Sequence, residues 1–170
     1  LGNYKTDSFK YQAYDGSQTS NTATVSIVII DQIGIDIKGE AADDYSGEAV
    51  SLSADGSTLA VGAFLNDGSG IDAGHARIYE WSGVAWVQKG EDIDAEAARD
   101  YFGVSVSLSN DGNALAVGGH FNDGNGNSSG HVRIFEWTGA SWSQVSDDIN
   151  GEAAGDWFGR SVSLSSDGLT

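Results

Sequence analysis

A segment of 56 residues repeats along the chain without insertions, and this repeat is the strongest constraint on the fold. Glutamates return at this interval as Glu40, Glu96 and Glu152, and many other residue types return with them. When the two complete copies are aligned, more than half of their positions are identical. A constant period without gaps indicates that one structural unit has been duplicated.

The repeat divides the chain into four parts. We assign residues 34–89 to a first repeat, 90–145 to a second and 146–170 to the start of a truncated third, while residues 1–31 precede the repeats. The chain contains no methionine, even at its first position. We therefore expect it to be a piece of a longer protein that supplies the remaining repeats.

Within one repeat the hydrophobic pattern is that of β-strands. Residues 105–109 alternate small polar with apolar side chains, which places one face of a strand against a core. Asp111 and Gly112 follow at once, and an Asp-Gly pair between alternating segments is typical of a tight hairpin. The predicted strands of the second repeat are residues 105–109, 114–118, 131–137 and 141–144. Each repeat is thus predicted to be a four-stranded antiparallel sheet.

Repeated four-stranded sheets commonly arrange themselves radially as the blades of a β-propeller, which leaves only short protected edges. The pattern of period two excludes a helical solenoid. With two complete repeats and part of a third, the chain is predicted to be all-β and to form an incomplete propeller.

Two strand-like runs precede the repeats, at residues 7–16 and 22–30. The first has the form F-x-Y-x-x-x-D-G and the second the form T-A-T-V-x-I. Their order resembles the last two strands of a bacterial immunoglobulin-like or cadherin-like sandwich. The resemblance covers about 30 residues and implies that the rest of such a domain lies upstream.

Composition excludes several classes of partner. The chain has 8 basic and 25 acidic residues and a net charge of −17, which repels nucleic acid and anionic lipid headgroups. It has no cysteine, so it can form neither a disulfide nor a thiolate site. No apolar run approaches the ~20 residues of a membrane helix, so no membrane insertion is predicted. An acidic, cysteine-free chain rich in Gly, Ser, Asp and Asn favours a secreted or surface protein.

Three motifs return in the repeats and resemble those of the FG-GAP family. They are F-G-x-S-V at residues 102–106 and 158–162, V-G-A at 61–63, and G-x-x-x-I-Y at 74–79. FG-GAP repeats form the blades of the propeller in integrin α-subunits and in many bacterial surface proteins. The resemblance implies a propeller, an extracellular location and an adhesive or protein-binding role without catalysis.

The calcium loop of that family is not present at its usual place. FG-GAP blades often carry D-x-D-x-D-G between their first two strands, whereas the short connections here contain a single carboxylate, Asp55 or Asp111. A lone Asp in a tight hairpin is better explained as a turn residue. The family's calcium site is therefore not carried over to these hairpins.

The connection between the second and third strands is the alternative place for calcium. It gathers oxygen-bearing side chains at alternating positions, a spacing that can direct hard ligands at Ca²⁺. The same residue types are also those of an ordinary tight loop, and both interpretations stay open. The candidate ligands are Asp67, Ser69, Asp72, Asp123, Asn125 and Asn127.

Two further sets of residues have a functional and a structural interpretation. Trp86 and Trp142 could form a platform for sugar rings, or they could pack across the strands against other tryptophans. His75 and His131 begin the predicted third strands, and no second histidine or cysteine lies near them in the sequence. We interpret them as structural residues, and no G-x-S-x-G elbow or phosphate-binding loop indicates an enzyme.

The sequence therefore predicts a non-catalytic adhesion or protein-binding segment of a larger extracellular protein, with calcium as the only candidate cofactor. Its partner would be a protein or glycan on a surface. Two alternatives stay open. One is a lectin-like module attached to a secreted hydrolase, and the other is a structural spacer.

Overall fold

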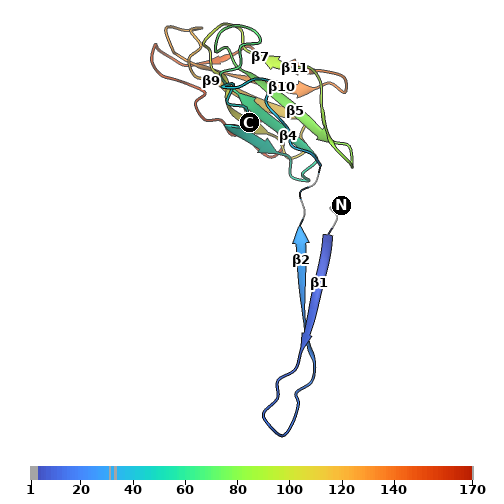
Figure 1. Ribbon diagram of the computed structural model, residues 1–170. Coiled ribbons are helices and arrows are strands. Elements are labelled where there is room, and N and C mark those ends of the chain that lie inside the picture. Colours follow the sequence, from blue (N-terminus) through green and yellow to red (C-terminus); the bar gives the residue numbers. More distant parts are fainter. Residues whose placement is uncertain (1–3, 31, 33, 170) are drawn as a thin grey trace. The chain divides into compact units, whose positions relative to one another are not determined.

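The computed structural model describes residues 4–30, 32 and 34–169 and contains only strands, turns and loops in that part of the chain. The predicted all-β class is confirmed. The chain divides into two compact units, Leu1–Ile35 with Gly83–Ala85 and Asp36–Ser82 with Trp86–Thr170. The first contains a hairpin and the second contains the repeats (Figure 1). No helix that could cross a membrane occurs among the described residues.

The hairpin consists of β1 (Tyr4–Tyr11) and β2 (Ala23–Ile30). The two strands are antiparallel, and their pairing runs without a break from Tyr4 opposite Ile30 to Tyr11 opposite Ala23. The first strand ends earlier than the predicted run at residues 7–16. Beyond it, the loop is closed by a hydrogen bond of 2.8 Å from the Ser20 amide to the Ala13 carbonyl. Two strands are thus confirmed, and the sandwich to which they were assigned stays a prediction.

Each complete repeat forms one antiparallel sheet of four main strands, as predicted, with a short fifth strand added. In both sheets the main strands follow sequence order, and the short strand pairs with the beginning of the third strand. The first sheet consists of β3 (Ala49–Leu52), β4 (Thr58–Ala63), β5 (His75–Trp81), β6 (Trp86–Gln88) and β7 (Ile93–Asp94). The second consists of β8 (Phe102–Leu108), β9 (Ala114–Gly119), β10 (His131–Trp137), β11 (Trp142–Gln144) and β12 (Ile149–Asn150).

The short fifth strands were not predicted, and they cross the boundary between sequence repeats. β7 belongs by sequence to the second repeat, yet it pairs with β5 of the first sheet, His75 opposite Asp94. β12 pairs in the same way with β10, His131 opposite Asn150. The beginning of each repeat therefore completes the sheet before it, and consecutive repeats are joined through backbone hydrogen bonds as well as through the connector.

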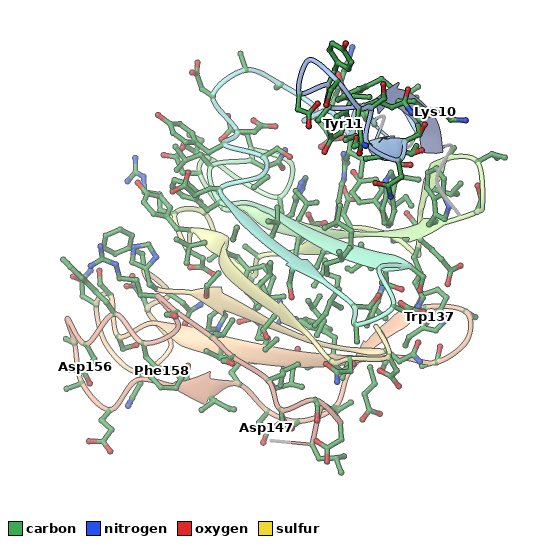
Figure 2. All side chains as sticks on the ribbon, turned by 90° about the horizontal axis from the view of Figure 1, so that it is seen from below. Lys10, Tyr11, Trp137, Asp147, Asp156 and Phe158 are labelled. Carbon is green, nitrogen blue, oxygen red and sulfur yellow. The ribbon has the colours of Figure 1, made fainter. Side chains whose placement is uncertain are left out.

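The core lies where the first sheet meets β8 of the second, which packs against β3 and β4. Ile78, Phe102 and Leu115 have no exposed surface, and alanines of the first sheet fill the space between these larger side chains. Figure 2 shows side chains filling the space between the sheets, with Trp137 and Phe158 at opposite ends of the repeat unit. Burial of these apolar groups is the main favourable contribution to folding.

The repeat motifs mark the places where neighbouring repeats approach most closely. A Cβ atom added to Gly62 would lie 1.9 Å from the Gly103 carbonyl oxygen, and one added to Gly118 would lie 1.8 Å from that of Gly159. The V-G-A glycine thus faces the F-G glycine of the next repeat. Only a residue without a side chain allows this approach, which explains why both motifs return together.

The third copy packs on the second as the second packs on the first, although residues 151–169 form no named strand. The Asn110 amide donates to the Ser166 carbonyl at 2.9 Å, and the Ala54 amide donates to the Asn110 carbonyl at 2.9 Å. The Leu164 amide likewise donates to the Ser107 hydroxyl at 2.9 Å. The contact between repeats is itself repeated, as propeller blades require.

Candidate functional site

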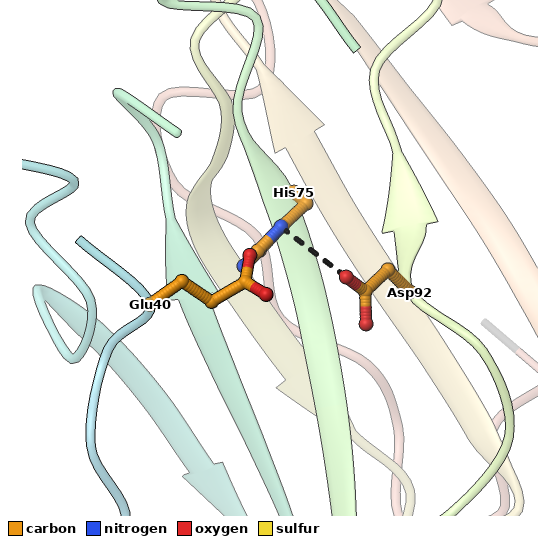
Figure 3. Close-up of side chains that lie close together, drawn as sticks. All are labelled: Glu40, His75 and Asp92. Atoms are coloured by element: carbon orange, nitrogen blue, oxygen red, sulfur yellow. Dashed lines mark ion pairs between the residues drawn. The ribbon is translucent and has the colours of Figure 1, made fainter. Parts of the chain in front are cut away.

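Four polar side chains converge at the beginning of β5. His75 and Arg77 are two residues apart on the strand and therefore point to the same face. Asp92 comes just before β7, whose pairing with β5 brings it to this face, and Glu40 comes from the segment before β3. Figure 3 shows Glu40 and Asp92 on either side of His75.

The arginine holds the two carboxylates of this cluster. Arg77 donates from Nε to Asp92 Oδ1 at 2.8 Å and from Nη2 to Asp92 Oδ2 at 2.7 Å, and it also forms an ion pair with Glu40. Gln88 donates to Asp92 Oδ1 at 2.6 Å. His75 Nδ1 lies 3.8 Å from Asp92 Oδ2. A two-pronged contact of this kind is among the stronger polar interactions in proteins.

These contacts set the charges of the cluster. The hydrogen bonds from Arg77 lower the pKa of Asp92, and those to Asp92 raise the pKa of Arg77. Burial, followed by the nearby charge of Arg77, lowers the pKa of His75. At neutral pH the cluster therefore contains ionised Asp92, charged Arg77 and an uncharged imidazole.

The second repeat contains the same four residue types but arranges them differently. His131, which is fully buried, lies with Nδ1 3.1 Å from Asp148 Oδ2. Arg133 donates to Gln144 Oε1 at 2.9 Å and to the Asp94 carbonyl at 3.1 Å, and its Nε lies 4.0 Å from Glu96 Oε1. Its guanidinium lies over the rings of two phenylalanines. The carboxylate of Asp148 is thus hydrogen-bonded to a histidine and to Gln144, and Arg133 forms a longer ion pair with it, with Nε 3.7 Å from Oδ1.

The two clusters offer carboxylate and imidazole groups of the kind that bind a metal ion. Each cluster, however, already contains the positive charge of an arginine side chain. The ligand atoms of Glu40, His75 and Asp92 lie within 4.8 Å of one another. Arg77 already supplies the positive charge that a bound metal ion would bring. We call the cluster of Glu40, His75, Arg77 and Asp92 the polar clasp. It links the connectors before and after the sheet to the third strand, and its geometry gives no reason to assign catalysis to it.

Sequence reasoning missed this clasp because its members are far apart along the chain. It treated His75 and His131 as isolated, whereas the structure brings an aspartate and a glutamate to each. One signal was available. The glutamate, histidine, arginine and aspartate of the first cluster all return 56 residues later, at Glu96, His131, Arg133 and Asp148.

The predicted calcium loops are closed by hydrogen bonds to their own backbone. Asp67 Oδ1 accepts from the Asp72 amide at 2.8 Å, and Asp123 Oδ1 accepts from the Ser128 amide at 2.7 Å. Asn125 donates instead to two carbonyls of the next connector. Such contacts are those of turn residues. Calcium binding by Asp67, Ser69, Asp72, Asp123, Asn125 and Asn127 stays a prediction.

The two tryptophans proposed as a sugar platform form cross-strand pairs. Trp86 faces Trp81 with ring centroids 5.5 Å apart, and Trp142 faces Trp137 at the same distance. The indole of Trp142 also donates to the carbonyl of Lys89 at 2.8 Å, which ties the last residue of the first repeat to the second. The structure thus places both residues in packing contacts, and sugar binding stays a prediction.

A hollow of about 630 Å³ opens between the connector before β8 and the loop between β9 and β10. Tyr101 and Phe121 form part of its wall, with ring centroids 4.8 Å apart. Asp123 and Asn127, two of the predicted calcium ligands, also line it. It is therefore a concave surface with aromatic and oxygen-bearing groups together.

Tyr101 belongs to a row of rings that crosses all three copies of the repeat. Phe64 lies between Tyr45 and Tyr101, at 5.4 and 5.7 Å, and Phe121 contacts Trp157 at 5.7 Å. Tyr45, Tyr101 and Trp157 occupy the same position of successive repeats, and the outer two are about half exposed. The row therefore presents an aromatic surface at the loop end of the sheets.

A comparison with known families supports the assignment made from the motifs. Residues 94–135 match the model of the FG-GAP repeat, a segment that runs from β7 into β10 and covers less than half of the chain. A search of curated proteins found no match. The second repeat is thus similar to an FG-GAP repeat, and its all-β sheet is consistent with one blade of a propeller.

Proposed function

We propose that this chain is a segment of a protein-binding β-propeller that acts in adhesion outside the cell. The observation that carries the proposal is the row of aromatic side chains across three successive repeats, next to the hollow at Tyr101 and Phe121. Aromatic residues are enriched at protein interfaces because they offer a large contact area and lose little conformational freedom. FG-GAP repeats occur in extracellular proteins, which supports the location.

The composition agrees with a protein partner on a surface. With a net charge of −17, the chain would be drawn to a partner with a basic surface and kept from nucleic acid. Tyr45 and Trp157 expose 55% and 44% of their surface, so a partner could bury both. Neither the hollow nor the clasp presents a nucleophile activated by a base, and catalysis forms no part of the proposal.

The test is binding of the protein to an array of purified extracellular proteins, followed by measurement of affinity for each protein that binds. We expect Trp157→Ala to weaken binding by at least about tenfold, as truncation of an aromatic residue that a partner buries can do. Val145→Ala, a change at an exposed apolar residue outside the row, is the matched control and should leave affinity unchanged.

Two results would contradict the proposal. One is the absence of any binding protein on the array, and the other is equal loss of affinity in both variants. Binding to a glycan array that is abolished by Trp86→Ala or Trp142→Ala would instead establish the lectin-like alternative.

A further inference from the structure

Lys89, the last residue of the first repeat, is buried at the junction with the second. It is 9% exposed, which is unusual for a lysine. Its amide donates to the Ile78 carbonyl at 2.7 Å and its carbonyl accepts from the Trp142 indole at 2.8 Å. Because its backbone is fixed on both sides, the side chain is directed into the second repeat.

The ammonium group reaches the turn between β8 and β9. Nζ lies 3.2 Å from the side-chain oxygen of Asn113 and 3.3 Å from the Gly112 carbonyl. Trp137 and Trp142 cover it, with ring centroids 5.3 and 5.7 Å from Nζ. Water is thus replaced over part of the group by two indole rings, which strengthens the polar contacts that remain.

A carboxylate completes the set. Oε1 of Glu80, on β5, lies 3.8 Å from Lys89 Nζ. An amine, a carboxamide and a carboxylate that moves protons are the three groups needed to form an amide bond between side chains. We propose that Lys89 and Asn113 form an isopeptide crosslink that joins the first repeat covalently to the second.

The reaction balances without a co-reactant. Glu80 takes a proton from the Lys89 ammonium, and the Nζ lone pair attacks the Asn113 Cγ atom. Collapse of the tetrahedral intermediate breaks the bond from Cγ to Nδ2, and protons returned by Glu80 allow the nitrogen to leave. A charged amine and a carboxamide thus become a secondary amide and one ammonium ion.

Hydrogen bonds at both ends of the Asn113 carboxamide hold it beside the amine. Reaction requires the attacking atom within about 3–3.5 Å of Cγ, and Nζ donates a hydrogen bond of 3.2 Å to Oδ1, the oxygen bonded to that carbon. Asp111 holds the other end of that group by accepting from Asn113 Nδ2 at 3.2 Å. The backbone amide of Asn113 also donates to Asp111, at 3.0 Å.

The set occurs at one junction, although the backbone is the same at both. Val145 occupies the place of Lys89 and makes the same amide contact, to the Ile134 carbonyl at 3.0 Å. Leu169 occupies the place of Asn113, whereas Glu136 keeps the carboxylate. The fold therefore does not require a lysine here. A crosslink at this junction would resist separation of the repeats in a chain that has no cysteine for a disulfide.

Mass spectrometry of the intact chain under denaturing conditions tests the proposal. We expect a mass lower than that calculated from the sequence by one ammonia, with no trypsin cleavage after Lys89 and a branched peptide that contains Lys89 and Asn113. Lys89→Arg and Asn113→Ala should show their full calculated masses. Glu80→Gln should slow or abolish the loss, while Glu136→Gln, the matched control, should leave it complete.

A further variant tests the chemistry of the crosslink while keeping a side chain of the same shape at position 113. Asn113→Asp would lose water instead of ammonia, so its crosslinked product has the same mass as that of the unsubstituted protein. The full calculated mass for the unsubstituted, folded protein, together with cleavage after Lys89, would overturn the proposal. Folding is followed independently by the near-ultraviolet circular dichroism of the tryptophans.

Discussion

Val50 and Val106 occupy the same position in successive repeats, yet Val50 is 60% exposed and Val106 only 8%. Leu52 and Leu108 differ in the same way, at 55% and 8%. The second pair is covered because β8 packs against β3 and β4 of the first sheet. Val50 and Leu52 lie on β3. Their face of the strand carries the same apolar residue types, but no described residue covers it.

We predict that this isolated chain associates through the face of β3. Apolar surface that another repeat would cover is driven out of water by contact with a second molecule. Light scattering at high concentration should give a mean mass above that of the monomer, and Val50→Ser with Leu52→Ser should restore the monomer.

Val87→Ser is the control for that experiment. Val87 is 55% exposed on β6, away from β3, and its change should leave association unaffected. A monomeric unsubstituted chain at high concentration would contradict the prediction.

The close approach of the glycines predicts a second effect. In Gly62→Ala, the new Cβ atom would meet the Gly103 carbonyl oxygen at 1.9 Å, so the two repeats must move apart. We expect the free energy of unfolding to fall by about 1–3 kcal/mol, the usual cost of overpacking. Urea denaturation measures this, and Val87→Ala should change the value far less. Equal stability of Gly62→Ala and the unsubstituted protein would show that the repeats are not packed in this way.

A sequence pattern could predict an element of this fold only where the pattern and the element involve residues close together in the chain. Alternation of side chains and the Asp-Gly pairs are local, so the four main strands of each sheet could be predicted. The strand β7 has two residues and no alternation to detect. β7 forms because Asp94 and Ile93 pair with His75 and Ala76 of β5. This pairing depends on the tertiary structure and not on a local sequence pattern.

The polar clasp could not be derived from spacing for the same reason. Glu40, His75 and Asp92 meet only through the register of β5 with β7 and the path of the connector. Periodicity marked each residue separately but did not show that they converge. Conversely, Trp142 was assigned a possible ligand role because a sequence does not reveal that its indole donates to the Lys89 carbonyl.

The clasp predicts a dependence of stability on pH. In the folded chain the pKa of Asp92 is lowered below its usual value of 3.8, chiefly by the hydrogen bonds from Arg77. Its contribution is therefore present above about pH 4 and is lost as the pH falls through the lower pKa of the folded state.

Asp92→Asn tests this dependence. We expect the substitution to lower the free energy of unfolding at pH 7 by about 1–2 kcal/mol, since the pair is partly screened by solvent. The difference from the unsubstituted protein should shrink as the pH is lowered below 4. Asp147→Asn, an exposed neighbour of the second cluster, is the control and should show little effect at either pH. A difference that stays constant with pH would show that the ion pair is not its cause.

Calcium provides the last prediction, and here the two interpretations of the loops differ in outcome. If the loop of Asp67 and its counterpart at Asp123 bind Ca²⁺, millimolar calcium should raise the melting temperature, because a ligand that binds only the folded state stabilises it. Asp67→Asn with Asp123→Asn should abolish that rise. Asparagine keeps an oxygen that can accept the backbone amides at 2.8 and 2.7 Å, so the fold of the loops should survive the change. The absence of a shift in the unsubstituted protein would leave these residues with the structural role that their hydrogen bonds describe.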